Sequence, residues 1–90
     1  MYRYKKSIPL SYERQGVIYF YSLLYRELDA DQQGIIRKIC RTAGGEHYRA
    51  LLEYVTEGED ILVVCRRHYI SRSTLLRAVK RYYMAMEDFF

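Results

Sequence analysis

The sequence lacks the features that mark membrane-spanning and disulfide-stapled proteins. It has no tryptophan, one proline and two cysteines, and its apolar runs are far shorter than the roughly 20 residues that a membrane-spanning helix needs. The two cysteines, Cys40 and Cys65, lie inside helix-like patterns rather than at loop corners, so we interpret both as reduced core thiols. Because the sequence also begins without a signal-peptide pattern, we expect a soluble cytoplasmic protein.

The spacing of cysteine and histidine does not predict a metal centre. Cys40 with His47, and Cys65 with His68, could together supply four zinc ligands. Zinc fingers instead take a cysteine pair and a histidine pair from separate short motifs. Core packing accounts for both cysteines, and we therefore expect no metal.

No catalytic set is visible either. Gly44 and Gly45 neither follow a strand nor precede the Lys-Ser/Thr of a phosphate-binding loop. The acids Glu57, Glu59 and Asp60 cluster in a loop between predicted helices, where solvated helix caps explain them better. We therefore expect neither an enzyme nor a cofactor.

Charge is distributed unevenly along the chain. Nine basic and nine acidic residues cancel over residues 1–60, whereas residues 61–90 hold six basic residues and two acids, which accounts for the whole net charge of +4. The run from Ile61 to Met86 contains no acid. A local basic surface fits the phosphate backbone of a nucleic acid, although a solvated helix face has the same composition.

Helical periodicity predicts an all-α protein of about five helices in a single domain. We divide the chain into a basic N-terminal arm (1–10), two N-terminal helices (11–43) and a unit of three helices (46–86).

The arm carries Arg3, Lys5 and Lys6 among tyrosines and contains the only proline, Pro9. We expect it to be extended and loosely held. It is then either a plain terminus or a basic arm that reaches the DNA minor groove.

The first helix is predicted over residues 14–28, after the N-cap Ser11. Apolar side chains recur there at intervals of three and four, which is typical of an amphipathic helix. This stripe predicts the buried face: Val17, Phe20, Tyr21, Leu24 and Leu28, widened by Ile18 and Tyr25.

Capping signals define the next two helices. Asp29, with Gln32 three residues later, has the pattern of a capping box and begins the second helix, which ends at a glycine pair after residue 43. A third helix is predicted over 46–56, with Gly58 as its stop.

Residues 61–68 admit two interpretations. The β-branched run 61–64 could form a strand, but the absence of a partner strand favours a helix capped by Asp60. Ser71 then caps a long final helix. Its predicted inner face comprises Leu75, Ala78, Val79, Tyr82 and Met86.

The stretch Ile61-Leu-Val-Val-Cys-Arg-Arg-His-Tyr-Ile-Ser-Arg-Ser-Thr-Leu-Leu-Arg-Ala-Val79 resembles the helix-turn-helix of small bacterial, phage and mobile-element transcriptional regulators. It is also similar to transposase-type and sigma region-4-type helix-turn-helix domains. The match is most specific over residues 70–75, the turn and the start of the recognition helix. The resemblance implies that a helix over about 71–86 enters the major groove of duplex DNA.

The same resemblance implies which side chains contact DNA. An arginine can make a bidentate contact to guanine, so we expect Arg72 and Arg77 to read bases. Lys80 and Arg81, one turn later, are expected to reach phosphates. The full predicted set is Ser71, Arg72, Ser73, Thr74, Leu76, Arg77, Lys80 and Arg81.

Two residues depart from the family's pattern. Tyr69 stands where glycine is usual, because the backbone there tends to be left-handed. Either the tyrosine adopts that conformation at a cost on the order of 1 kcal/mol, or the turn differs slightly in shape. His68 stands where an apolar or aromatic residue is usual.

The eleven tyrosines leave two interpretations open. The five helices could hide the rings in one core, or the rings could form a homodimer interface through the aromatic-rich N-terminal helix or the C-terminus. Dimers of helix-turn-helix proteins read two half-sites one helical turn apart.

The expected function is sequence-specific binding of double-stranded DNA, by a nucleoid-associated regulator or a mobile-element accessory protein. The alternative is a protein-interaction module, whose basic helix docks on an acidic partner such as RNA polymerase or another regulator. Affinity for random duplex DNA separates the two, because it depends steeply on salt in the first and is near zero in the second.

Overall fold

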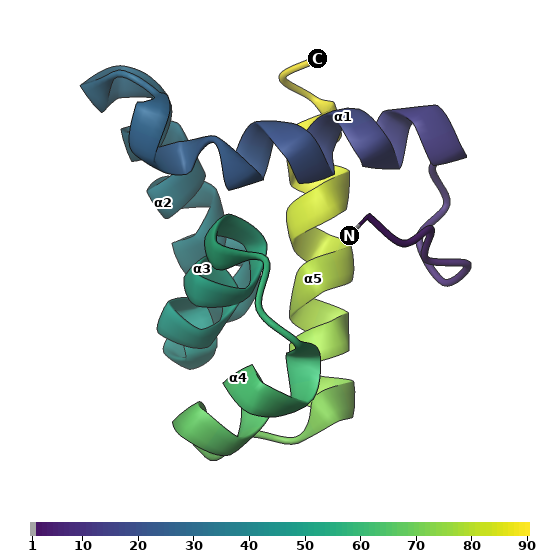
Figure 1. The fold of residues 1–90 in the computed structure, drawn as a ribbon, viewed down its shortest axis with the longest axis vertical. Coiled ribbons are helices and arrows are strands. Elements are labelled where there is room, and N and C mark those ends of the chain that lie inside the picture. Colours follow the sequence, from purple (N-terminus) through teal and green to yellow (C-terminus); the bar gives the residue numbers. More distant parts are fainter. Residues whose placement is uncertain (1) are drawn as a thin grey trace.

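The computed structural model describes residues 2–90, and all regular structure in that range is helical, as predicted. Two short 3-10 turns, Tyr25–Glu27 and Gly45–His47, join successive helices. Over the same range, no helix is long and apolar enough to cross a membrane. The α-helices are α1 (Tyr12–Leu23), α2 (Ala30–Gly44), α3 (Tyr48–Glu57), α4 (Ile61–His68) and α5 (Arg72–Glu87), as Figure 1 shows.

The long final helix organises the fold. α5 packs along α2, and α3 packs against both (Figure 1). α1 crosses the C-terminal half of α5, where Arg14 of α1 pairs with Glu87 at 2.6 Å. α4 packs against α3 and the beginning of α5. α1 and α4 therefore lie at opposite ends of α5 (Figure 1).

The predicted N-caps are confirmed. The side chains of Ser11, Asp29, Asp60 and Ser71 each accept a hydrogen bond from a backbone N–H in the first turn of the following helix. The capping box is complete, because Gln32 Oε1 also accepts from the backbone N–H of Asp29 at 3.1 Å. These bonds satisfy donors that have no partner within the helix.

The predicted third and fourth helices are also confirmed. α3 ends at Glu57, and Gly58 follows with a φ of 67°, a conformation that glycine adopts without strain. Residues 61–64 are helical, so the strand interpretation of that run is wrong.

The predicted buried face of the first helix is wrong in part. α1 ends at Leu23, and its buried residues are Gln15, Ile18 and Ser22. These side chains project from one side of the helix, toward α5 and the N-terminal arm. Of the other apolar residues predicted to be buried, three are half-buried against the core: Tyr21, Tyr25 and Leu28. Three lie on the other side and are exposed by 44–56%: Val17, Phe20 and Leu24.

The N-terminal arm is not loosely held. The amide of Gln15, which is fully buried, accepts from the Lys5 backbone N–H and donates to the Lys5 carbonyl, both at 2.9 Å. The same amide nitrogen lies 3.1 Å from the Leu10 carbonyl. Ile8 is 1% exposed and belongs to the core. The arm thus supplies hydrogen-bond partners for Gln15. Its polar side chain can therefore be buried, although the pattern of apolar residues did not place it on the buried face.

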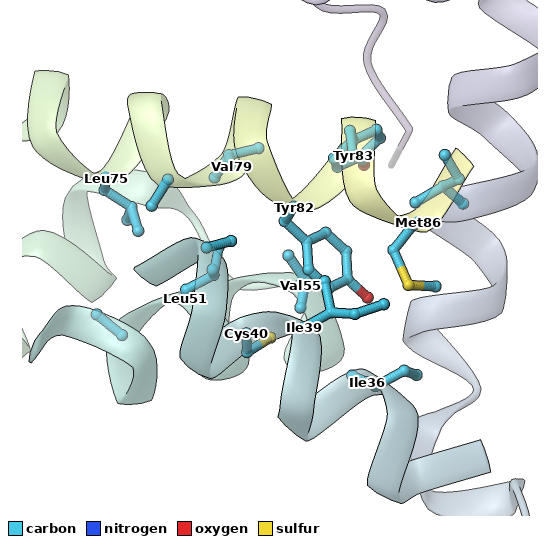
Figure 2. Close-up of a cluster of buried hydrophobic side chains, with 14 of the residues drawn as sticks. Ile36, Ile39, Cys40, Leu51, Val55, Leu75, Val79, Tyr82, Tyr83 and Met86 are labelled. Carbon is cyan, nitrogen blue, oxygen red and sulfur yellow. The ribbon is translucent and has the colours of Figure 1, made fainter. Parts of the chain in front are cut away.

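The centre of the core is the ring of Tyr82, which lies between α5 and α2 among apolar side chains (Figure 2). Its hydroxyl lies 2.7 Å from Ser22 Oγ of α1. Ser22 donates its own proton to the Ile18 carbonyl at 2.7 Å, so Tyr82 is the donor in the bond between the two side chains. The inner face predicted for the last helix is confirmed: Leu75, Ala78, Val79, Tyr82 and Met86 are all buried.

Replacement of Tyr82 by phenylalanine tests this bond. Tyr82→Phe removes the donor and leaves Ser22 Oγ without one partner, so we expect the free energy of unfolding to fall by about 1–2 kcal/mol. Urea denaturation measures the change. Tyr69→Phe is the matched control, because Tyr69 is 95% exposed and its hydroxyl contributes nothing to the core. Equal stabilities for the two variants would show that the buried bond makes no net contribution.

Alkaline pH should destabilise the fold. Burial raises the pKa of the Cys40 thiol from 9.0 to about 12. Burial also raises the pKa of Tyr82 and of Tyr83 far above 10.0. A group whose pKa is raised by folding stabilises the protein fully below its unfolded pKa, and this contribution is lost as pH rises toward the folded value.

We therefore expect the free energy of unfolding to decline from about pH 9 upward, by roughly 3–5 kcal/mol at pH 11. Urea denaturation at intervals across this range measures the slope. In Cys40→Ala the decline should begin near pH 10, because only the two tyrosines then contribute. A wild-type profile that stays level to pH 11 would contradict the burial of these groups.

Candidate nucleic-acid interface

The turn between α4 and α5 is built around a residue with left-handed backbone. Tyr69 has a φ of 56° and a ψ of 44°, and its N–H bonds to the Cys65 carbonyl. The N–H of Ile70 bonds to the same carbonyl at 3.1 Å. This pair of bonds ends α4, while the half-buried Ile70 packs against the core. The turn therefore has the left-handed backbone for which the resemblance expects glycine.

Tyr69 is the only residue other than glycine with a positive φ in the described range 2–90. Its side chain is 95% exposed and has no packing that could offset the strain. The sequence thus places a bulky residue at a position whose backbone favours glycine.

Ser71 fixes the start of α5. Its Oγ accepts from the Thr74 backbone N–H at 3.1 Å and donates to Thr74 Oγ1 at 2.7 Å. Arg77 Nη2 lies 3.5 Å from the same Thr74 oxygen. Ser71 and Thr74, both predicted to contact DNA, therefore also stabilise the first turn of α5.

The first three turns of α5 have a buried side and a solvent side. Leu75, Ala78 and Val79 are buried, whereas Leu76 and Thr74 are half-buried at the boundary. The predicted contact residues on the solvent side are exposed: Ser71, Arg72, Ser73, Arg77, Lys80 and Arg81. The structure therefore brings most of the predicted site residues to one surface.

Arg81 has a structural role that the sequence did not reveal. Its Nε donates to the Ala43 carbonyl at 2.8 Å, near the end of α2. This bond satisfies a carbonyl that lacks an intrahelical partner and holds α2 against α5. The guanidinium is therefore committed in part to the fold, although Arg81 was predicted to reach phosphates.

Acidic side chains occupy only part of the basic surface. Glu53 of α3 pairs with Arg67, and its Oε1 lies 2.9 Å from His68 Nε2. Glu59 lies 3.7 Å from the same arginine. The unusual histidine in the turn motif is thus explained by Glu53, an acid from a different helix.

The remaining cations have no acid beside them. Across residues 2–90, no carboxylate lies within 4.0 Å of Arg66, Arg72, Arg77 or Lys80. Arg66, on α4, was not among the predicted site residues, although it lies in the acid-free run. We call these four residues and the turn between α4 and α5 the basic corner.

The cysteines have the predicted buried environment. Cys40 and Cys65 are both free thiols. The pKa of Cys65 is raised, because the effect of burial is larger than the opposing effect of the nearby Arg72 guanidinium. Within the described part of the chain, no group of three or more His, Cys, Asp and Glu side chains could hold a metal ion.

Comparison with protein-family models, with curated proteins and with solved structures gives no match for this chain. The interpretation of the basic corner therefore rests on its own geometry and charge.

Replacing Tyr69 by glycine should stabilise the protein. Relief of the left-handed strain contributes about 1–2 kcal/mol, and the greater backbone freedom of unfolded glycine offsets roughly half of it. We expect a net gain of about 0.5–1 kcal/mol in the free energy of unfolding, measured by urea denaturation.

Tyr69→Ala is the matched control. Alanine retains the strain and removes the same exposed side chain, so its stability should stay within about 0.5 kcal/mol of the wild type. A loss of stability in the glycine variant would contradict the left-handed conformation of the turn.

Proposed function

We propose that the chain binds duplex DNA sequence-specifically, with the N-terminal half of α5 in the major groove. The observation that carries this proposal is the basic corner, where four exposed cations without acid partners surround the capped start of a 16-residue helix. An exposed helix that follows a tight turn has the shape to enter the major groove of DNA, and the positive charge of the basic corner can pair with the DNA phosphates.

The dipole of α5 adds to this charge. The N-terminus of a helix carries partial positive charge, and no acid lies in the first turn of α5 to neutralise it. Arg72 begins the helix, and Arg66 lies just before the turn. A phosphate near Ser71 would therefore meet both backbone and side-chain positive charge.

Individual roles follow from position on α5. Arg72 and Arg77 are exposed on the outer side, where a guanidinium can reach O6 and N7 of guanine. Ser73 and Thr74 can serve a base or a phosphate, and Leu76 can contact a thymine methyl group. Lys80, one turn further from the capped end, contributes to phosphate binding.

In the cell, such a protein would act as a transcription regulator or as a mobile-element accessory protein. Regulation is a narrower proposal than binding, because it requires a particular operator.

A homodimer, one of the two interpretations of the aromatic residues, has a geometric consequence. The exposed apolar side chains of α1, Val17, Phe20 and Leu24, lie at the end of α5 opposite the basic corner. A two-fold contact through this face would place the two basic corners at opposite ends of the pair. Two half-sites one helical turn apart lie on the same face of DNA, so we propose that each chain binds its site as a monomer.

Substitutions in the basic corner test DNA binding. Arg72→Ala or Arg77→Ala should weaken binding to a selected site by about 1–3 kcal/mol and relax the base preference there. Lys80→Ala should weaken all sequences alike and reduce the slope of log affinity against log salt by about 1. Gel-shift titrations over a range of salt, with oligonucleotides selected from a random pool, measure both effects.

Lys38→Ala is the matched control, because Lys38 is an exposed lysine of α2 and lies outside the basic corner. It should leave affinity and salt slope nearly unchanged. If wild-type protein showed no salt-dependent affinity for random duplex DNA, the basic corner would instead fit the alternative, docking on an acidic protein.

A further inference from the structure

A cavity of about 330 Å³ lies between the N-terminal arm, α1, the loop from α3 to α4, and α5. Three tyrosines from three helices line it: Tyr19 of α1, Tyr54 of α3 and Tyr83 of α5. Arg3 and Lys5 of the arm line it as well. We call it the tyrosine cavity. Its volume is that of a small-molecule site, and its lining residue on α5, Tyr83, lies three positions beyond Lys80 of the basic corner.

Tyr83 has an unusual environment for a buried polar residue. It is 4% exposed and lines the cavity, and among residues 2–90 its hydroxyl has no hydrogen-bond partner. Because no buried polar side-chain atom in that range lacks a partner, this hydroxyl is open to solvent. The neighbouring Tyr82 is also buried, but its hydroxyl donates to Ser22. The hydroxyl of Tyr83 is therefore available to donate a hydrogen bond to a ligand in the cavity.

The phenol groups of the cavity are close to one another. Burial is the main cause that raises the pKa of Tyr83, and the nearby phenols of Tyr54 and Tyr19 raise it further. The pKa of Tyr19 is raised for the same reasons, by burial and then by Tyr54. These two phenols stay protonated at neutral pH, so they can donate hydrogen bonds to one ligand.

The cavity lining carries two cations, Arg3 and Lys5, and two acids, Glu59 and Asp60, and among residues 2–90 only the acids have hydrogen-bond or ion-pair partners for their side chains. In the described part of the chain, no acid lies within 4.0 Å of Arg3 or Lys5, and Lys5 Nζ lies 5.6 Å from the centre of the Tyr54 ring. The two acids at the rim are already engaged. Asp60 caps α4 with an oxygen 2.8 Å from a backbone nitrogen, and Glu59 pairs with the arginine of the α4 end.

The position of the lysine is built into the fold. The buried amide of Gln15 holds both the N–H and the carbonyl of Lys5, so the arm reaches the cavity in one register. The remaining wall is apolar and includes Val55 and Ile61. The protonated hydroxyls and the cations can bind an anionic group. The aromatic rings and aliphatic side chains can contact a flat apolar body attached to that group.

We propose that the tyrosine cavity binds a small aromatic carboxylate. The carboxylate accepts from the hydroxyl of Tyr83 and pairs with Lys5, while its ring contacts the tyrosine rings and the aliphatic wall. An inorganic anion would leave the apolar wall unfilled, and a neutral ring would leave the cations unpaired. This assignment goes beyond DNA binding and does not depend on it.

Titration of the isotope-labelled full chain with benzoate tests the proposal. Amide resonances of Lys5, Gly58 and Tyr83 should shift with a dissociation constant on the order of 0.1–1 mM, a typical affinity for so small a ligand. Benzamide, the neutral analogue, and inorganic phosphate, which lacks the ring, should each bind at least about tenfold more weakly. Absence of benzoate-dependent shifts at these residues would overturn the proposal, as would phosphate binding as tight as that of benzoate.

Two variants separate the site from a general loss of structure. Tyr83→Phe should weaken benzoate about tenfold, the effect of one hydrogen bond to a charged group, without loss of stability, because the hydroxyl has no protein partner. Lys5→Gln should weaken benzoate by a similar factor and leaves the core intact. The matched controls Tyr12→Phe and Lys38→Gln, both at exposed residues outside the cavity, should bind benzoate as the wild type does. Unchanged affinity in both cavity variants would contradict the site.

Discussion

The hydrogen bond from Tyr82 to Ser22 is the constraint on which the rest of the structure depends. It is fully buried and joins α5 to α1 across 60 residues of sequence. Ser22 is already donating to the Ile18 carbonyl, so only a protonated Tyr82 completes the chain of bonds. The bond fixes where α1 crosses α5, and that crossing decides which side of α1 is buried. Two polar residues of α1 are then inside the protein, while three large apolar ones face solvent.

The same crossing divides α5 into two functional halves. Its C-terminal half lies under α1 and carries Tyr82 and Tyr83, whereas its N-terminal half begins beside α4 (Figure 1). Consecutive residues of a helix point about 100° apart, so the two tyrosines enter different surroundings. Tyr82 meets a hydroxyl partner in the core, and Tyr83 meets the cavity beside the arm. One rigid helix therefore forms part of both proposed sites.

Local signals in the sequence predicted the parts of the fold that depend on local bonds. The four N-caps, the capping box at Asp29 and the stop at Gly58 each involve residues within four positions of one another, and all are confirmed. At Tyr69 the resemblance left two alternatives open, a left-handed backbone or a turn of different shape, and the structure has the left-handed one.

The failures concern partners that are distant in sequence. Gln15 is buried because the arm bonds to it, and no periodicity of apolar residues contains that information. Arg81 was predicted to bind phosphate because nothing in the sequence joins it to the Ala43 carbonyl, 38 residues away. The basic corner could be predicted as a charged surface from the acid-free run, but the engagement of Arg67 and His68 by Glu53 required the packing of α3 on α4.

Two features cost the fold free energy without compensation from packing, and a third group has no partner in the protein. Tyr69 is strained although its side chain lies in solvent, and the cations of the basic corner repel one another. The hydroxyl of Tyr83 has no hydrogen-bond partner among residues 2–90 and is open to solvent. Strain and unsatisfied groups are expected where a protein meets something other than itself. The strained turn lies at the start of α5 and the basic corner extends from it to Lys80, whereas the hydroxyl lines the cavity beside the arm. The difference in shape between an exposed helix face and a cavity favours two distinct ligands, a polyanion on the surface and a small anion in the cavity.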